Sequence, residues 1–279
     1  MSFKFNFSMP SDDTIDEKAH LDNSASVITD DDDSKALPSQ EISRNTAQNV
    51  GDLSTTEHNV CGVVFRVIRQ QDVNVSSSAL QVTTDSDLVP GVYEGGLKIW
   101  ECGVDLAEYL INHNIDCKGL RVLELGCGAG LPGLTAMHKG AAVVDFQDYN
   151  PEVVENITIP NVELNQCSDC KCRFFSGDWS SLPLTICTDD EEKRYDIILT
   201  AETIYNTRSY RKLHQAFQQL LKQNGTIYLA AKSTYFGVGG GTRLFEAFLK
   251  RENVFTSQVC LEIEAGVPRE ILKVTRQTS

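Results

Sequence analysis

Short apolar runs and amphipathic segments alternate along most of the chain. Runs of Val, Ile, Leu and Phe are typical of buried strands, whereas apolar residues three and four apart are typical of one helix face. The pattern predicts strands at residues 60–69, 120–125, 143–147, 172–176, 196–200, 226–231, 255–261 and 270–275. It predicts helices at residues 131–139, 151–164, 209–222 and 241–250, and a further one from residue 97 with Trp100, Val104, Ala107 and Ile111 on one face.

Regular alternation of strands and helices predicts an α/β fold in which a parallel sheet is covered by helices on both faces, a doubly wound, Rossmann-like arrangement. Pro151 suits the first turn of its helix. Pro160 interrupts that same helix, because a proline inside a helix lacks the N–H that its partner carbonyl needs. Asn224 and Gly225 are expected to end one helix and open the next strand.

The first part of the chain has a different composition. Residues 1–60 carry twelve acids and four bases, a net charge of −8, which leaves −6 for the other 219 residues. With few large apolar residues, such a segment buries too little surface to offset the entropy lost on ordering. We therefore expect residues 1–57 to be a disordered acidic tail and residues 58–279 to form one domain. The run TDDDDS at residues 29–34 is either solvated chain or an electrostatic lure for a basic partner.

The remaining composition bears on membrane insertion, secretion, the redox compartment and metal binding. No run approaches the ~20 apolar residues of a membrane span, and the first residues lack the apolar core of a signal peptide. Nine cysteines, an odd number, indicate free thiols in a reducing compartment. The segment CSDCKC, with Cys187 as a fourth thiol, resembles a zinc site in spacing, but an incidental loop is favoured, and no metal is expected.

A glycine turn follows the strand at residues 120–125 and precedes a helix. Its glycines are Gly126, Gly128 and Gly130, in the place where a doubly wound sheet binds a nucleotide. A dinucleotide fingerprint would require glycine or alanine where Leu131 stands, and Glu124 would repel a pyrophosphate. S-adenosylmethionine carries no phosphate and has two cationic groups, so a carboxylate at this position favours it.

Acids also end the next two strands. Asp148 can accept hydrogen bonds from both ribose hydroxyls, or it can begin the next helix. Asp178 can accept from an adenine amine, and Trp179 can cover the ring or belong to the core. Three such signals at the ends of successive strands predict a cofactor site.

These motifs resemble those of the seven-β-strand methyltransferases: ELGCGAG their first motif, FQDYN their second-strand acid and GDW their adenine motif. The resemblance covers residues 97–275 and implies a seven-stranded sheet of order 3-2-1-4-5-7-6, with the penultimate strand antiparallel. It implies S-adenosyl-L-methionine as the cofactor. It assigns cofactor contacts also to Ile99, Trp100, Glu101, Gln147, Tyr149 and Thr200, with a core position as the alternative for Trp100.

Other segments narrow the resemblance. PGVYEGGLKIWE, TAETIYN and YFGVGGGT resemble the histidine protein methyltransferases, and FKFNF resembles the start of those enzymes. The lysine-modifying subgroup has Asp-x-x-Tyr after its fourth strand, where this chain has Glu202 and Tyr205. A carboxylate that accepts from one imidazole N–H leaves the other nitrogen free to take a methyl group. Glu202 is the candidate for that role, with a bond to the cofactor or to a helix start as its alternative, and Tyr205 would shape the pocket. The glycine-rich residues 236–241 are either a mobile substrate loop or a plain flexible connector.

The resemblance implies a basic protein substrate, a histidine-bearing protein of the large ribosomal subunit. We expect no direct contact with nucleic acid or membrane, a monomer, and residence in the cytoplasm and nucleus, the nucleolus included. The alternatives are a lysine methyltransferase of the same fold and a non-catalytic domain that binds S-adenosylmethionine or recruits a basic partner. A dinucleotide oxidoreductase is the least favoured, because Glu124 and Leu131 disagree with it.

Overall fold

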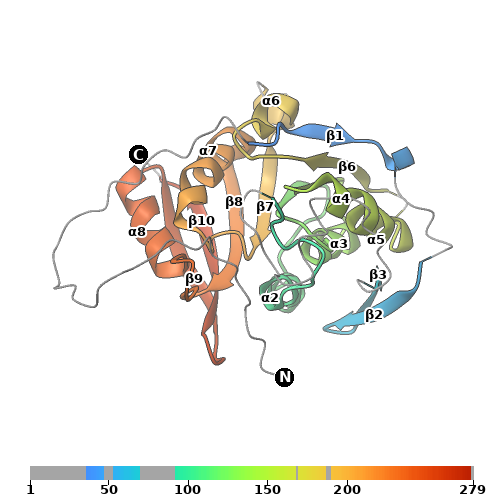
Figure 1. Cartoon of the computed structure of the whole chain (residues 1–279), viewed down its shortest axis with the longest axis horizontal. Coiled ribbons are helices and arrows are strands. Elements are labelled where there is room, and N and C mark those ends of the chain that lie inside the picture. Colours follow the sequence, from blue (N-terminus) through green and yellow to red (C-terminus); the bar gives the residue numbers. More distant parts are fainter. Residues whose placement is uncertain (1–35, 47–52, 70–91, 168, 187–189, 278–279) are drawn as a thin grey trace, which may run out of the picture.

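The computed structural model describes residues 36–46, 53–69, 92–167, 169–186 and 190–277 (Figure 1). One eight-stranded sheet has the order β1-β6-β5-β4-β7-β8-β10-β9, and β2 and β3 form a separate two-stranded sheet. The strands are β1 (Gln40–Ile42), β2 (Thr55–Val60), β3 (Val63–Ile68), β4 (Arg121–Leu125), β5 (Val143–Asp148), β6 (Lys171–Ser176), β7 (Tyr195–Ala201), β8 (Leu221–Lys232), β9 (Phe255–Ile263) and β10 (Arg269–Arg276).

The predicted topology is confirmed. Strands β6, β5, β4, β7, β8, β10 and β9 lie in the order 3-2-1-4-5-7-6 when they are counted from β4 along the chain. The pairs β4–β5, β5–β6, β4–β7 and β7–β8 are parallel. Strand β10, in the penultimate position, is antiparallel to both β8 and β9.

An eighth strand comes from the segment expected to be disordered. Gln40–Ile42 forms β1, which pairs antiparallel with β6 at the edge of the sheet. Ile42 is buried, and the guanidinium of Arg44 lies 5.4 Å from the centre of the Phe174 ring. The interpretation of residues 1–57 as a disordered tail is therefore wrong for this stretch. The run TDDDDS and the Phe-rich start lie outside the described residues.

The expected strand at residues 60–69 is one arm of a hairpin. Strands β2 and β3 pair antiparallel around Cys61 and Gly62, which both have positive φ. The Asn59 side chain accepts a hydrogen bond from the Gly62 N–H at 2.8 Å, which closes the turn. The polar sequence of β2 concealed this strand, because only Val60 in it is fully buried.

The helices lie close to their predicted positions, apart from the short helix α6, which was not predicted. They are α2 (Glu101–Asn112), α3 (Leu131–His138), α4 (Pro151–Val153), α5 (Ile159–Leu164), α6 (Leu182–Ile186), α7 (Tyr210–Leu220) and α8 (Thr242–Glu252). Helix α2 begins at Glu101 rather than at residue 97, so Trp100 precedes it. Its buried residues are Cys102, Leu106, Ala107, Tyr109 and Leu110. Of the predicted face, Ala107 is fully buried, and Val104 and Ile111 are partly buried and pack against the same core.

Pro160 is accommodated by a local change of helix type. Residues Val154–Thr158 form a π-helical segment (η6) between α4 and α5, so the chain stays helical from Pro151 to Leu164. A wider turn moves the hydrogen-bond partners by one residue, which lets the helix pass a residue without an N–H.

Asn224 and Gly225 were expected to open this strand, but β8 begins at Leu221 and both residues lie inside it. Tyr195 pairs with Leu221 and Ile197 with Thr226, so the intervening residues of β8 form an irregularity in the ladder. A local bulge of this kind leaves the strand continuous on both sides.

Two hydrophobic cores cover the two faces of the sheet. Residues of α2, α3 and α5 pack on one face, and residues of α6, α7 and α8 pack on the other (Figure 1). This is the doubly wound arrangement that the alternating pattern predicted. No helix among the described residues is both long and apolar enough to cross a membrane.

Candidate active site

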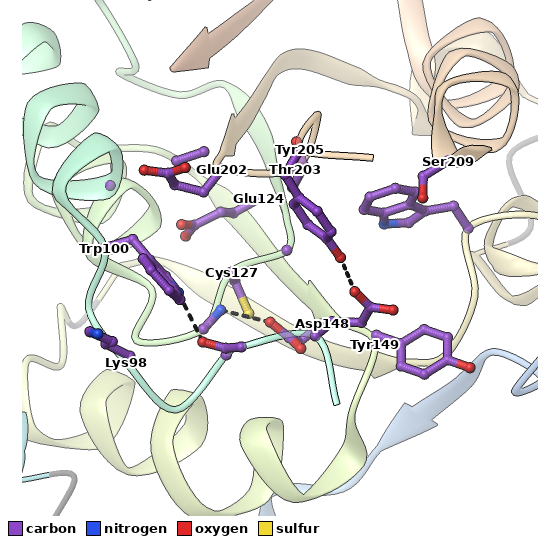
Figure 2. Close-up of a pocket in the computed structure, with 18 of the residues that line it drawn as sticks. Lys98, Trp100, Glu124, Cys127, Asp148, Tyr149, Glu202, Thr203, Tyr205 and Ser209 are labelled. Carbon is purple, nitrogen blue, oxygen red and sulfur yellow. Dashed lines mark hydrogen bonds between the residues drawn. The ribbon is translucent and has the colours of Figure 1, made fainter. Parts of the chain in front are cut away.

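A cavity of about 450 Å³ opens where the parallel strands end (Figure 2). Its walls come from the turns after β4, β5, β6 and β7, from the segment before α2 and from the loop after β8. Of the predicted site residues, eleven line it: Ile99, Trp100, Glu124, Gly126, Gly128, Asp148, Tyr149, Asp178, Trp179, Glu202 and Tyr205. Three others, Glu101, Gln147 and Thr200, are not among the lining residues.

The glycine turn after β4 depends on the absence of side chains. Gly126 and Gly128 have φ of 64° and 48°, in the left-handed region. A Cβ on Gly126 would lie 2.6 Å from Cγ2 of Thr203, and one on Gly128 would lie 2.9 Å from the carbonyl oxygen of Gly96. Two glycine-containing segments thus pack backbone against backbone, and together they present main-chain groups to the cavity.

Asp148 ends β5 at the floor of the cavity. Its Oδ2 accepts a hydrogen bond from the Gly128 N–H at 2.9 Å, so the acid also fixes the glycine turn (Figure 2). The side chain is 3% exposed, and burial raises the pKa of its carboxyl to about 6. A buried acid beside a cavity can exchange such bonds for hydroxyl donors of a ligand.

Glu124 lines the same cavity from the end of β4. Its Oε2 accepts the Gly133 N–H, in the first turn of α3, at 2.8 Å. Burial raises the pKa of this carboxyl well above its usual value, and the nearby charge of Asp148 adds to the effect. Two acids side by side make this end of the cavity unfavourable for a phosphate.

The motif after β6 forms another wall. Asp178 Oδ1 accepts from the N–H and hydroxyl of Ser180, and its Oδ2 lies 3.2 Å from Nζ of Lys212. The Trp179 Nε1–H donates to Oε1 of Gln147 at 2.8 Å, so Gln147 holds the indole from behind the wall. Asp178 therefore already has partners besides any adenine amine.

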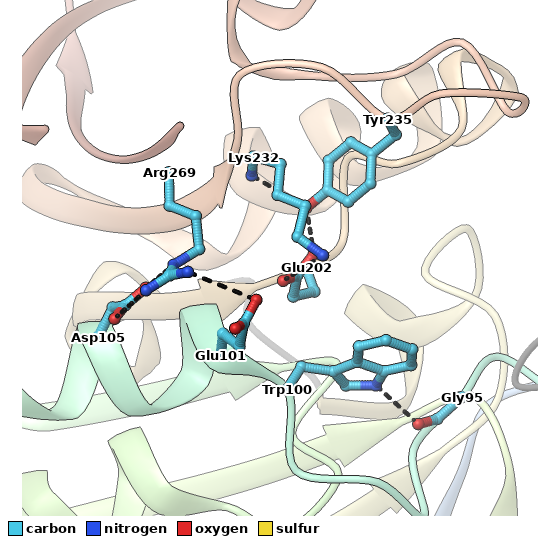
Figure 3. Close-up of polar contacts among 8 residues, drawn as sticks. All are labelled: Gly95, Trp100, Glu101, Asp105, Glu202, Lys232, Tyr235 and Arg269. Atoms are coloured by element: carbon cyan, nitrogen blue, oxygen red, sulfur yellow. Dashed lines mark hydrogen bonds and ion pairs between the residues drawn. The ribbon is translucent and has the colours of Figure 1, made fainter. Parts of the chain in front are cut away.

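Two more residues that were predicted to contact the cofactor, Thr200 and Glu101, do not line the cavity. Thr200 donates to the Leu125 carbonyl at 3.0 Å and contacts the Thr203 hydroxyl at 2.7 Å, so it ties β7 to β4. Glu101 Oε2 lies 3.4 Å from Nη1 of Arg269. Trp100, by contrast, lines the cavity, and its Nε1–H donates to the Gly95 carbonyl at 2.9 Å (Figure 3).

The far end of the cavity is built around Glu202. Its backbone has φ of 58°, a left-handed conformation that is uncommon for a glutamate and that clusters at functional sites. The Tyr235 hydroxyl donates to Oε2, and Nζ of Lys232 lies 3.9 Å from Oε1 (Figure 3). Among the described residues, no nitrogen or oxygen donor forms a hydrogen bond to Oε1, although this atom is buried.

Neighbouring side chains shape this end. The Tyr205 hydroxyl donates to the Glu94 carboxylate, which ties the loop after β7 to the segment before α2. The Tyr205 and Tyr235 rings meet edge to face with centres 6.4 Å apart. The Cys102 thiol lies beside Glu202, and burial together with the Glu202 charge raises its pKa well above the usual value.

Sequence reasoning missed Tyr235, Lys232 and Cys102 here. The first two flank the turn that leads into the glycine-rich residues 236–241, which were noted only as a loop. That loop is held in place: Tyr235 N–H donates to the Gly240 carbonyl at 2.9 Å, and Gly239 pairs with Asn206. These contacts join the loop to itself and to the loop after β7.

The cysteine-rich segment is separate from the cavity. Sγ of Cys170 and Cys172 lie 4.0 Å apart, and Cys187 lies outside the described residues. In the described part of the chain, no group of three or more His, Cys, Asp or Glu side chains is placed to hold a metal ion.

Comparison with known proteins agrees with this geometry. Residues 80–248 match a family model described as lysine methyltransferase. A Bos taurus protein named histidine protein methyltransferase 1 homolog is 43% identical over 217 residues, 69% of this chain and 58% of its own length. A Dictyostelium discoideum protein of the same name is 43% identical over 194 residues, 69% of this chain and 61% of its own length.

A solved structure supports the fold alone. A protein from Streptococcus mutans, described as a SAM-dependent methyltransferase, superposes with a TM-score of 0.53 at 14% identity. The match covers 78% of this chain and 55% of that one. The chain spans about three fifths of the length of the Bos taurus and Dictyostelium discoideum relatives.

Proposed function

The chain belongs to the lysine methyltransferase family, and we propose that it is an S-adenosylmethionine-dependent enzyme that methylates a histidine side chain of another protein. The observation that carries the proposal is the Glu202 carboxylate, which lines the cavity together with Tyr205 and Tyr235 and stands in a left-handed backbone conformation. The names of the relatives at 43% identity support the same acceptor.

The residues of the cavity fit the cofactor. S-adenosylmethionine supplies a methyl group on a cationic sulfur and carries no phosphate. The glycine turn leaves room for a ligand beside main-chain groups, and Asp148 would accept from ribose hydroxyls. Trp179 would cover the adenine ring, with Gln147 fixing the indole. Glu124 and Asp148 would favour the cationic end of this cofactor over a pyrophosphate.

Glu202 would select one tautomer of the target imidazole. Neutral imidazole has one N–H and one nitrogen with a free lone pair. When the Glu202 carboxylate accepts the N–H, the lone pair on the other nitrogen faces away from the carboxylate. That nitrogen would take the methyl group, which the cationic sulfur of the cofactor supplies, and the sulfur would keep the electron pair of the broken C–S bond. The methylated ring would carry the positive charge beside Glu202 and would release its N–H proton to solvent.

The competing function, methylation of a lysine, differs from the proposed one in the acceptor group. A lysine acceptor has a pKa of about 10.4 and must lose a proton before it can attack, whereas imidazole, near 6.5, is already neutral at pH 7.5. Glu202 is surrounded by Tyr235, which also lines the cavity, and by Cys102 and Lys232, which do not. Burial raises the pKa of both Tyr235 and Cys102 well above their usual values, so neither is a ready base for an ammonium group. This favours histidine.

We further propose that the substrate is a basic protein of the large ribosomal subunit and that the enzyme works as a monomer in the cytoplasm and nucleus. The net charge of −14 supports attraction to a basic partner. The resemblance of residues 90–101 and 235–242 to the histidine protein methyltransferases suggests the ribosomal target.

The proposal is tested by incubating the full chain with methyl-labelled cofactor and isolated large-subunit ribosomal proteins, followed by acid hydrolysis and amino-acid analysis. We expect the label in methylhistidine. Methyllysine as the only labelled product would replace the acceptor and leave the fold and the cofactor unchanged. Cofactor binding without any labelled protein in this substrate pool would contradict the ribosomal target.

A further inference from the structure

A buried cation lies next to the acceptor end of the cavity, outside its lining residues. Lys232 is the last residue of β8, its side chain is 7% exposed, and its Nζ lies 3.9 Å from Oε1 of Glu202 (Figure 3). Nζ also lies 5.8 Å from the centre of the Tyr235 ring, on the residue whose hydroxyl donates to Oε2. Burying a cation is costly without a partner. Here the partner is the same carboxylate that is proposed to orient the substrate.

The other groups that face Glu202 leave this pair electrically balanced. From α2, the Cys102 thiol lies beside the carboxylate and is kept neutral by its raised pKa. From the loop after β8, burial and the Glu202 charge raise the pKa of Tyr235, which therefore also stays neutral.

The nearest further charges form a cluster of their own. Arg269 lies 2.5 Å from Asp105 and 3.4 Å from Glu101 (Figure 3). Arg269 is thus engaged with these two acids, and Lys232 is the cation next to Glu202.

We infer that Lys232 is a specificity-determining residue that offsets the charge of Glu202, so that the acceptor site takes a neutral imidazole and rejects an ammonium group. The inference rests on the proposed function and deepens it. A lone buried carboxylate would favour a cation, either a lysine side chain or the imidazolium form, and neither has a free lone pair. The Lys232 ammonium repels both and leaves the hydrogen-bond acceptor in place.

The test uses the full chain saturated with S-adenosylhomocysteine and two small probes, 4-methylimidazole and n-butylamine, whose binding is measured by ligand-observed NMR at pH 7.5. We expect the wild type to prefer 4-methylimidazole. Lys232→Met should lower the ratio of imidazole to butylammonium affinity by about 10-fold or more, because the uncompensated carboxylate attracts the cation. It should also make imidazole binding stronger at pH 6 than at pH 8, the reverse of the wild type.

Three variants serve as controls. Lys222→Met, on the same strand β8, removes a lysine that pairs with Asp196 at 2.8 Å, and it should leave both the ratio and the pH dependence unchanged. Lys232→Arg keeps the charge and should keep the preference. If Lys232→Met folds poorly because a buried carboxylate is left unpaired, Lys232→Gln, which offers a neutral donor, is measured in its place.

The failure of this inference is distinct from failure of the proposed function. Glu202→Gln should weaken 4-methylimidazole binding by about 10-fold, because a neutral amide oxygen is a poorer acceptor than a carboxylate; unchanged binding would mean that Glu202 is not the acceptor residue, and the proposed function would lose its support. If Glu202→Gln does weaken binding but folded Lys232→Met or Lys232→Gln keeps the wild-type ratio and pH dependence, Lys232 is only structural and the inference is overturned.

Discussion

The two ends of the cavity are formed by different kinds of groups. The cofactor end consists of main-chain turns and of acids at the ends of adjacent parallel strands, and Gly128 binds Asp148 across only twenty residues of sequence. The acceptor end consists of side chains that meet from distant segments: Tyr205 reaches Glu94 across 111 residues, and Tyr235 reaches Glu202 across 33. The comparison indicates that one end can be shared by many enzymes of this fold, whereas the other carries the choice of substrate.

The two ends also treat their buried charges differently. At the cofactor end, Glu124 and Asp148 have raised pKa values because burial disfavours their charged forms, and main-chain N–H groups offset only part of this. At the acceptor end, Glu202 is matched by Lys232. The first end is therefore suited to a ligand with its own positive charge, and the second to a neutral one.

The largest effect is expected from Gly128→Val. A β-branched residue at φ of 48° is strained, and its Cβ would meet the Gly96 carbonyl at 2.9 Å. We expect cofactor affinity, measured by calorimetry, to fall by at least ~10³-fold, about 4 kcal/mol. Gly266→Ala is the matched control, since a Cβ there has no neighbour within 4 Å and the residue lies away from the cavity. Retained affinity in Gly128→Val would mean that the turn is not the cofactor site.

The next effect separates the two ends. Glu202→Gln keeps the shape of the acceptor site but removes its charge, so it should lower kcat by ~10²-fold, at least ~2.7 kcal/mol of transition-state stabilisation, with cofactor affinity little changed. Single-turnover kinetics and calorimetry on the same sample measure both quantities. A loss of cofactor binding instead would move Glu202 to the cofactor end and leave the imidazole without an orienting group.

The contrast between the ends explains what the sequence could predict. The succession of strands and helices, the glycine turn and Asp148 follow from local patterns, because hydrophobic runs and glycine-rich turns are specified within a few residues. The strand order came instead from the resemblance to the seven-β-strand methyltransferases. Lys232 and Tyr235 have no such local signal. Their role depends on where the β7 and β8 ends lie relative to each other, a consequence of sheet pairing.

Two further differences from the sequence expectations also depend on how distant segments pack together. Strand β1 lies in an acidic, polar segment, and its pairing with β6 rather than its composition makes it a strand. The resemblance assigned cofactor contacts to Gln147 and Thr200, and neither residue lines the cavity. Gln147 accepts from the Trp179 indole and Thr200 donates to the Leu125 carbonyl, so both hold residues of the wall in place.

Asp148→Asn tests the charge at the cofactor end. Because the pKa of Asp148 in the folded protein, about 6, lies above its usual value of 3.8, its ionisation destabilises the fold. The contribution to the free energy of unfolding is largest below pH 4, falls as the pH rises through 6 and is then constant. The ligand-free variant should therefore be more stable than the wild type at pH 7.5, on the order of 1–3 kcal/mol, with the gain shrinking towards pH 4.

The same substitution should weaken cofactor binding at pH 7.5 by ~10–30-fold, since a neutral amide is a poorer acceptor for two ribose hydroxyls than a carboxylate. Thermal melts across pH 4–8 measure the stability, and calorimetry measures the affinity. A variant that loses stability at pH 7.5 would show that the bonds to Gly128 and Asn150 outweigh the cost of burying the charge.

The smallest effect concerns the edge of the cofactor end. Ala36 lines the cavity, the Asp178 N–H donates to the Leu37 carbonyl at 2.8 Å, and the Ser39 N–H donates to the Ser181 hydroxyl at 2.7 Å. A Cβ on Gly177 would lie 2.5 Å from the Pro38 carbonyl, so this segment packs directly on the adenine-motif turn.

Removal of residues 1–46 should therefore weaken cofactor binding by ~3–10-fold, the equivalent of one or two lost hydrogen bonds, whereas removal of residues 1–35 should leave it unchanged. Calorimetry on both truncations, with thermal melts to verify folding, makes the comparison. Equal affinity in the two would restrict the cofactor end to the turns after β4, β5 and β6. A loss already present when only residues 1–35 are removed would assign a cofactor role to the acidic segment as well.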